Sequence, residues 1–218
     1  LDRMPRAAAA AIPLVEPSER RPAHAACLNA PEGQELGSFL AGACALRRTA
    51  VLEVGGYREF LVHHQEERDL SLRLLDKGWS ITYVGGSPLV HLRSPTRDPV
   101  RMGLFGVRNT ILVAFLNVPF PFVIAQILGA CLNLVLYQFG FRTLPLRLRG
   151  MVLGLQACRE FRKYRQPVSR ETYRRYRALP KHGPADYLER LPEAARRSVS
   201  SGGIQGPSDT SAFCTPKT

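Results

Sequence analysis

Three acidic side chains lie within four consecutive residues, where the hydrophobic pattern predicts the first turn of a helix. They are Glu66, Glu67 and Asp69. A carboxylate beside a substrate hydroxyl group can accept its proton, which is the role of a general base in a group-transfer reaction. Acids in a first helical turn are, however, most often solvated partners of the helix dipole. The chemistry of this cluster must therefore be judged from the pattern around it.

Histidine, glycine and cysteine add few further candidates. His63 and His64 precede the acids, but the HExxH spacing of a zinc hydrolase is absent. The pair Gly55-Gly56 stands in no GxGxxG or GxxxxGK motif, so it predicts a tight turn rather than a phosphate-binding loop. The five cysteines are widely spaced and form no CxxC pair. They indicate neither a zinc site nor a disulfide framework and are typical of a reducing compartment.

The acidic cluster begins the clearest predicted helix, residues 65–77. Leu70, Leu74 and Leu75 share its inner face, and Gly78 stands where a C-terminal cap belongs. Around it we expect a buried strand within residues 38–46, a helix over 47–54, a strand over 79–84 and an extended piece over 89–91. Residues 1–36 hold an alanine run and several prolines, which predicts an irregular lead-in.

A long uncharged segment follows these elements. The 33 residues 109–141 contain no Asp, Glu, Lys, Arg or His. Pro119 and Pro121 divide the segment and leave residues 122–141 uninterrupted, close to the roughly 20 residues that span a bilayer core. Gln126, Asn133 and Gln138 make this stretch less apolar than a simple span. Three interpretations stay open: a transmembrane helix, a re-entrant or interfacial helix pair, and a buried helix of a soluble core.

The next segment is strongly basic. Residues 142–177 hold eleven Lys and Arg against two acids, a net +9 in a chain whose total is +12. An apolar stripe at helical spacing runs among these arginines, formed by Leu148, Met151, Val152, Leu155 and Cys158. A basic amphipathic helix beside an apolar segment is typical of a membrane interface, and the positive-inside rule indicates its cytoplasmic side. We therefore expect a membrane surface as a partner and the cytoplasmic face of the cell membrane as the location.

Several short blocks of residues follow one another in a recognisable order and spacing. They are Ala41-Gly42 through Arg47-Arg48, Gly55-Gly56-Tyr57, Glu66-Glu67-Arg68-Asp69-Leu70, Arg73-Leu74 through Gly78, and His91 with Ser94. Together these blocks resemble the C-terminal half of the catalytic domain in family 2 glycosyltransferases of the GT-A type. The first block departs from the family pattern, because its small pair is Ala-Gly rather than Gly-Ala. Downstream, Arg108-Asn109, the uncharged segment and the basic stretch RQPVSRETYRRYR are similar to bacterial rhamnosyl- and cell-surface-glycan members. The resemblance covers about residues 38–179.

This resemblance implies an inverting transfer of a sugar from a nucleotide-sugar donor to a lipid-linked or cell-surface glycan acceptor. It places Glu67 at the general-base position, where aspartate is more common. Glu66 and Asp69 would help to fix the acceptor and the helix start, and His91 falls where some members supply a metal ligand. A divalent metal, Mg or Mn, is expected in the complete enzyme to neutralise the leaving nucleoside diphosphate. For Arg73 we expect a structural, ion-pairing role.

The expected fold class is α/β, a partial GT-A fold made of the acceptor-side half, followed by hydrophobic and amphipathic helices. We expect an irregular lead-in (1–36), the glycosyltransferase half-domain (37–100), a membrane-associated helical region (101–180) and a mostly disordered tail (181–218). Family members begin with a nucleotide-binding half that carries a D-x-D motif, and no D-x-D occurs in this sequence. We therefore expect a truncated enzyme whose isolated chain transfers no sugar.

Two other functions compete with this interpretation. One is an inactive, membrane-associated remnant or interaction module of a glycosyltransferase. The other is nucleic-acid binding, because Tyr164, Tyr173 and Tyr176 alternate with arginines and could stack on bases. No known nucleic-acid motif accompanies these tyrosines, and lipid accounts better for the adjacent apolar run. We therefore do not expect a nucleic acid among the partners of this protein.

Overall fold

The computed structural model describes residues 1–15, 31–86, 89–90, 98–136 and 144–180. The strands are β1 (Ala7–Ala11), β2 (Leu14–Val15), β3 (Glu35–Leu36), β4 (Cys44–Leu46), β5 (Ser80–Tyr83) and β6 (Leu89–Val90). The α-helices are α1 (Arg48–Glu53), α2 (Glu66–Asp76), α3 (Pro99–Asn117), α4 (Phe122–Leu136), α5 (Leu144–Glu160) and α6 (Arg170–Ala178). Two 3-10 turns, η1 (Ala41–Ala43) and η3 (Arg162–Tyr164), complete the described elements. The chain is thus a mixed α/β protein.

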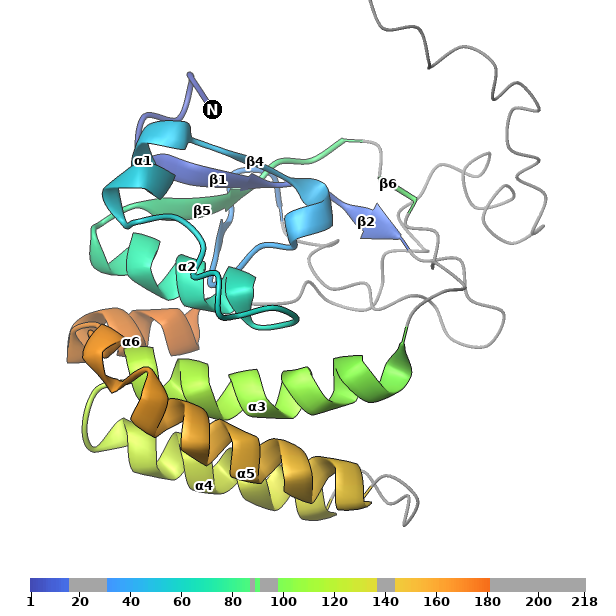
Figure 1. The fold of residues 1–218 in the computed structure, drawn as a ribbon. Coiled ribbons are helices and arrows are strands. Elements are labelled where there is room, and N and C mark those ends of the chain that lie inside the picture. Colours follow the sequence, from blue (N-terminus) through green and yellow to red (C-terminus); the bar gives the residue numbers. More distant parts are fainter. Residues whose placement is uncertain (16–30, 87–88, 91–97, 137–143, 181–218) are drawn as a thin grey trace, which may run out of the picture.

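A small mixed sheet forms the upper layer of the molecule (Figure 1). Its strand order is β3-β5-β1-β4, and β2 pairs separately with β6. The central pair, β1 and β5, is parallel, with Ala11 opposite Tyr83. The outer pairs are antiparallel, with Ala9 opposite Leu46 and Leu36 opposite Ile81. The sheet therefore depends on pairing between the first residues of the chain and a strand some 70 residues later.

The prediction that residues 1–36 are irregular is wrong for the alanine run. All five residues of Ala7–Ala11 are buried, at 0 to 5% exposure, in the centre of the sheet. Alanine is a poor strand former by itself, and a strand buried on both faces lacks the apolar–polar alternation that reveals a half-exposed strand. Local pattern therefore gave no strand signal. The strand forms because both of its edges find hydrogen-bonding partners, β4 and β5.

The elements expected around the acidic cluster are mostly confirmed. Helix α1, strand β5 and the first two residues of the extended piece at 89–91 form as predicted. Within residues 38–46, however, only Cys44–Leu46 is a strand, and the 3-10 turn Ala41–Ala43 precedes it. This turn matters for the site, because it brings the Ala41 backbone amide toward the start of α2.

Helix α2 ends as the sequence predicts. The N–H of Gly78, at φ +81°, donates to Leu75 O, and the N–H of Trp79 donates to Leu74 O. This is the Schellman arrangement, in which the left-handed residue is usually glycine. The predicted inner face is only partly correct: Leu70 and Leu74 pack under the sheet, whereas Leu75 packs with Leu72 against the helices below. The helix is therefore buried on two sides and joins the two layers.

Below α2 the chain stacks further helices (Figure 1). Helix α3 lies beneath α2, and α4 and α5 form the layer farthest from the sheet. Helix α5 packs along α3 at close range, because Gly150 and Gly154 present no side chain to Val107 and Ile111. Helix α6 returns to pack beside α2, so the last described helix closes onto the half of the chain that contains the sheet.

The uncharged segment folds as two helices separated by the predicted proline break. Its second part forms α4, 15 residues long, which corresponds to about 22 Å at 1.5 Å per residue, shorter than a bilayer core of about 30 Å. Residues 137–143, the remainder of the candidate span, lie outside the described residues. Within the described ranges, no helix has both the length and the apolar character needed to cross a membrane.

Candidate functional site

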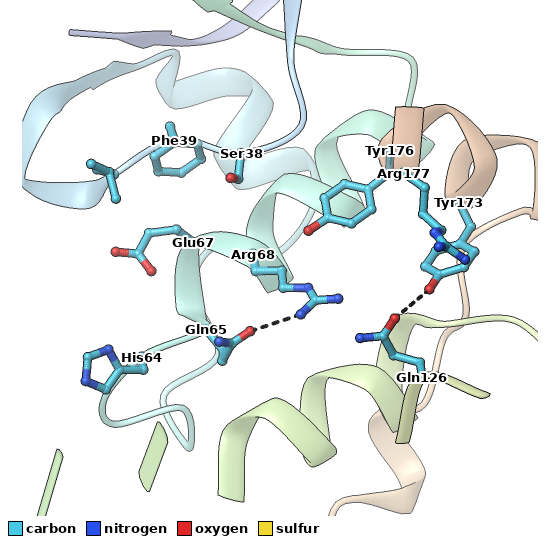
Figure 2. Close-up of a pocket in the computed structure, with 11 residues that line it drawn as sticks. Ser38, Phe39, His64, Gln65, Glu67, Arg68, Gln126, Tyr173, Tyr176 and Arg177 are labelled. Carbon is cyan, nitrogen blue, oxygen red and sulfur yellow. Dashed lines mark hydrogen bonds between the residues drawn. The ribbon is translucent and has the colours of Figure 1, made fainter. Parts of the chain in front are cut away.

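An open cleft of about 630 Å³ lies at the N-terminal end of α2 (Figure 2). Its walls come from the segment before η1, the turn that enters α2, the first turn of α2, and single faces of α4 and α6. The lining residues are Ser38, Phe39, Leu40, His64, Gln65, Glu67, Arg68, Gln126, Tyr173, Tyr176 and Arg177. Among the predicted site residues that the structure describes, only Glu67 lines this cleft. The described lining residues therefore offer one carboxylate among aromatic and cationic groups.

Glu67 is held at the edge of the cleft by its backbone surroundings. Its Oε1 accepts a weak hydrogen bond from the Ala41 amide at 3.4 Å. Partial burial, the largest effect, raises the pKa of this carboxyl above its ordinary value, and the charge of Glu66 adds to the rise. Backbone hydrogen bonds and His64 act in the opposite direction but do not cancel it. The result is a half-buried carboxylate that is more basic than a solvated glutamate.

Two side chains near Glu67 were not predicted from the sequence. Burial raises the pKa of the Cys44 thiol, and Glu67 is the second cause. Burial also raises the pKa of Tyr57 to about 12, with Cys44, Glu67 and Glu66 as further causes. These mutual effects place a thiol and a phenol in the electrostatic neighbourhood of the carboxylate, both held in their neutral forms. The only sequence signal for Tyr57 was its place in the Gly-Gly-Tyr block.

The turn that presents α2 is strained. His64 and Gln65 both have left-handed backbones, with φ of 62° and 71°, and neither is glycine. Non-glycine residues in this region typically cost about 1 kcal/mol or more each and persist only where the surroundings enforce them. The enforcing group is Asn109 of α3, whose Nδ2 donates to His63 O at 2.6 Å and to His64 O at 3.1 Å. Strain of this kind is typical of functional sites.

Arg108 completes this support. Its guanidinium donates to Phe60 O at 3.0 Å and to Asn109 Oδ1 at 2.7 Å, which orients the amide toward the turn. The Arg108-Asn109 pair, noticed in the sequence only as part of a resemblance, therefore holds the loop that leads into the site. The position of this pair at the start of the uncharged segment gave no indication of which loop it would contact.

Asp69 does not reach the cleft. It is fully buried, and its carboxylate accepts hydrogen bonds from Arg58 at 2.8 Å, Arg73 at 2.6 Å and Asn117 at 2.7 Å. The ion pair with Asp69 confirms the predicted ion-pairing role of Arg73, which also donates to the carbonyl oxygens of Val54 and Gly56. These contacts make Asp69 a structural link between α2, the loop after α1, and α3, so the expected help with fixing an acceptor would have to act through the scaffold.

The other two predicted site residues also stand apart from the cleft. Glu66 is half-buried beside Glu67, but it does not line the cavity, and its Oε2 has no hydrogen-bond partner within the described part of the chain. His91 lies outside the described residues. In the parts of the chain that the structure describes, no three His, Cys, Asp or Glu side chains are grouped to hold a metal ion.

The far wall of the cleft comes from residues that sequence reasoning assigned elsewhere. Tyr173 and Tyr176 are buried at 1% and 2% exposure, and the Tyr173 hydroxyl donates to Gln126 Oε1 at 3.0 Å (Figure 2). Tyrosines buried to this extent cannot stack on the bases of a nucleic acid. The sequence did contain a hint of this burial, because two tyrosines three residues apart lie on the same face of a helix. Base stacking, the role that the nucleic-acid interpretation gave to these tyrosines, is therefore excluded for Tyr173 and Tyr176.

Comparison with known protein families, curated proteins and solved structures finds no match to this chain. The site itself combines several features that bear on function. Its features are a half-buried basic carboxylate, a strained turn enforced by buried polar groups, and an adjoining cleft with two arginines, Arg68 and Arg177. A carboxylate in such surroundings is suited to proton abstraction from a bound hydroxyl group.

Proposed function

We propose that the chain is the acceptor-side part of an inverting glycosyltransferase, and that Glu67 is its general base. The observation that carries the proposal is the placement of Glu67, the one carboxylate among the described residues of the cleft wall, with its pKa raised by burial. The motif order described above, which resembles family 2 glycosyltransferases, supports the same assignment. The proposed donor is a nucleotide-sugar, and the proposed acceptor is a lipid-linked or cell-surface glycan.

In the proposed reaction the acceptor hydroxyl lies in the cleft beside the Glu67 carboxylate. Its oxygen attacks the anomeric carbon of the donor sugar and forms the new glycosidic bond, while its proton passes to Glu67. The bond from the anomeric carbon to the diphosphate oxygen breaks, and the nucleoside diphosphate leaves with the electron pair. A base with a raised pKa takes up the proton more readily, provided that the carboxyl is ionised at the working pH.

The protein environment contributes orientation as well as basicity. The Ala41 amide fixes one carboxylate oxygen, and the turn held by Asn109 fixes the start of the helix that carries Glu67. Arg68, the neighbour of Glu67 on α2, and Arg177, on α6, suit an acceptor that carries negative charge. A divalent metal would supply charge neutralisation at the leaving diphosphate. The described residues contain no ligand set for it, so no step is assigned to a metal here.

Sugar transfer tests the proposal directly. Chain 1–218 is assayed alone and together with a separately supplied nucleotide-binding polypeptide that carries the D-x-D half, with radiolabelled nucleotide-sugars and membranes of the source organism as acceptor. We expect transfer only in the combined sample and a loss of about 10²- to 10⁴-fold in Glu67→Gln, the usual contribution of a general base. The matched control is Glu59→Gln, an exposed glutamate outside the cleft.

The pH profile adds a second readout. Because burial raises the pKa of Glu67, transfer should fall as the pH is lowered through the titration of this carboxyl, and the residual rate of Glu67→Gln should lack that limb. Wild-type rates in Glu67→Gln would exclude this residue as the base. No transfer by any folded form with any donor would support the inactive-remnant interpretation instead.

A further inference from the structure

Helix α4 exposes an apolar stripe. Ile124, Leu128 and Leu132 stand at i, i+4 and i+8, and each is more than half exposed, with Leu128 the highest at 64%. The helix holds no charged residue at all. Exposed apolar residues scattered singly are ordinary on soluble proteins, but a continuous row on an uncharged helix marks a surface that contacts something apolar.

Helix α5 extends the same kind of surface. Its outward residues Leu148, Val152 and Leu155 are about half exposed, at i, i+4 and i+7. Its inward side is occupied, because Gly150 and Gly154 pack directly on α3. The outward residues therefore cannot turn into the core without breaking that contact. Helices α4 and α5 touch each other and together form the layer farthest from the sheet (Figure 1), so the two exposed stripes belong to the same layer of the molecule.

Cationic side chains accompany these stripes. Arg149 and Arg159 are exposed on α5 itself, one residue from Leu148 and four from Leu155. At the other end, exposed Arg170 donates to Phe120 O, and exposed Arg174 lies over the Phe122 ring. Phe120 is itself 62% exposed. The pattern combines apolar residues that can enter an acyl layer with arginines placed to meet anionic headgroups.

We propose that this α4–α5 face, formed by the two exposed stripes and their flanking arginines, binds the surface of an anionic lipid bilayer. The charge pattern selects this occupant over a second copy of the chain. A two-fold contact would bring the flanking arginines of this face, Arg149, Arg159, Arg170 and Arg174, toward the same arginines of a second copy, and like charges oppose such a contact. An anionic bilayer offers both the apolar layer and the opposite charge. The inference does not depend on the proposed sugar transfer.

The arrangement also has a consequence for the cleft. Gln126 lines the cleft from one side of α4, while Ile124 and Leu128 lie on the exposed side of the same helix. Bilayer binding through α4 would therefore leave the cleft on the opposite side of this helix, about one helix diameter of 10 Å from the membrane surface. A lipid-linked molecule could then reach the cleft with its polar part while its hydrocarbon chain stays in the bilayer.

Vesicle co-sedimentation tests the proposal with the full chain. Purified 1–218 is mixed with vesicles of phosphatidylglycerol and phosphatidylcholine, or of phosphatidylcholine alone. We expect binding to the anionic vesicles that weakens with salt, and at least tenfold weaker binding to the neutral ones. The double variant Leu128→Gln/Leu132→Gln should lose about tenfold or more in affinity, and Arg149→Gln/Arg159→Gln about fivefold per arginine for anionic vesicles alone.

The matched control is Leu52→Gln, because Leu52 on α1 is 58% exposed and lies in the other layer. All substituted positions are exposed, so circular dichroism should show unchanged helix content. Absence of binding to anionic vesicles, or equal loss in the Leu52 control, would overturn the proposal. A dimer on gel filtration that Leu128→Gln/Leu132→Gln converts to monomer would also overturn it, and would identify the face as a self-association surface.

Discussion

At the scale of single residues, the site is defined by two neighbouring acids that differ in burial and in hydrogen bonding. Glu67 and Asp69 are two positions apart on one helix, yet one lines a cleft and the other is fully buried. Glu67 receives one weak amide hydrogen bond, whereas two guanidinium groups and an amide saturate Asp69. The less satisfied carboxylate is the one free to act on a ligand, and the saturated one holds the scaffold.

Burial of Glu67 predicts a stability that depends on pH. A carboxyl whose pKa is raised by folding is protonated more easily in the folded than in the unfolded chain, so its stabilising contribution is present at acid pH and is lost as the pH rises through the folded pKa. Glu67→Gln should therefore have a higher Tm than wild type at pH 8, with the difference vanishing toward pH 4. Thermal unfolding across this range measures it, and Glu59→Gln is the control. An equal or lower Tm at pH 8 would contradict the burial of this carboxylate.

Substitution of Asp69 should change the stability more than substitution of Glu67, and it should lower the stability rather than raise it. Asp69→Asn leaves Arg58 and Arg73 nearly buried, at 11% and 10% side-chain exposure, without their counter-charge. Removing one partner of a buried ion pair typically costs about 3–5 kcal/mol. We expect a loss of that size in the free energy of unfolding by urea. The control is Asp76→Asn, since the exposed Asp76 accepts one backbone hydrogen bond that an asparagine can also accept. A loss below about 1 kcal/mol in Asp69→Asn would refute the structural role.

At the scale of elements, the close contact of α3 with α5 places the outer layer. A Cβ added at Gly150 would lie 2.8 Å from Val107 Cβ and 3.1 Å from Leu104 O, which is too close for either to remain in place. The glycines at 150 and 154 are spaced by four residues, so they lie on one side of α5 and permit this approach along more than one turn. The same contact turns Leu148 and Val152 outward.

Gly150→Ala is therefore expected to destabilise the protein by about 1–3 kcal/mol through overpacking. Gly129→Ala on α4 is the matched substitution, because nothing lies within 4 Å of its added Cβ. It should be neutral or stabilising by up to about 1 kcal/mol, the intrinsic preference of a helix for alanine. Urea unfolding of both variants gives the comparison. Equal effects of the two substitutions would mean that α5 does not approach α3 this closely.

At the scale of the whole molecule, α2 links the two layers. Leu70 and Leu74 belong to the core beneath the sheet, while Leu72 and Leu75 belong to the core that α3, α4 and α6 share. Asp69 adds a polar link through Asn117 at the end of α3. A boundary near residue 100, as the sequence suggested, therefore does not separate the described residues into two independent cores.

This sharing predicts cooperative unfolding. Trp79, the single tryptophan, packs against the sheet core and reports on that layer through its fluorescence, while far-UV circular dichroism reports mainly on the helices. We expect the two signals to give coincident urea transitions, the mark of a two-state unit, and Asp69→Asn to shift both together. A helical transition clearly separated from the Trp79 transition would show instead that the layers unfold independently.

The sequence by itself determined the features that rest on short-range signals. Helix α2 with its Gly78 cap, strand β5, the proline break before α4 and the ion-pairing role of Arg73 were all predicted. Each of these features depends on periodicity, turn chemistry or charge within a few neighbouring residues. Glu67 was a candidate for the same reason, since acids at a helix start are visible in the sequence. The five-residue stripe expected on α5 is divided in the structure, because Leu148, Val152 and Leu155 are exposed whereas Cys158 is buried and packs with Met151 in the helical core.

Only the tertiary structure decided the rest. Ala7–Ala11 becomes a central strand because β4 and β5, distant in sequence, supply its hydrogen bonds. Asp69 lies outside the cleft because it is buried in hydrogen bonds with Arg58 and Asn117 from other elements. Helix α6 forms one wall of the cleft because Tyr173 and Tyr176 are buried in the core that it shares with α2 and α4. Pairing and burial between distant segments leave little trace in local pattern, and at this site they separate the carboxylate that faces the cleft from the one that holds the fold.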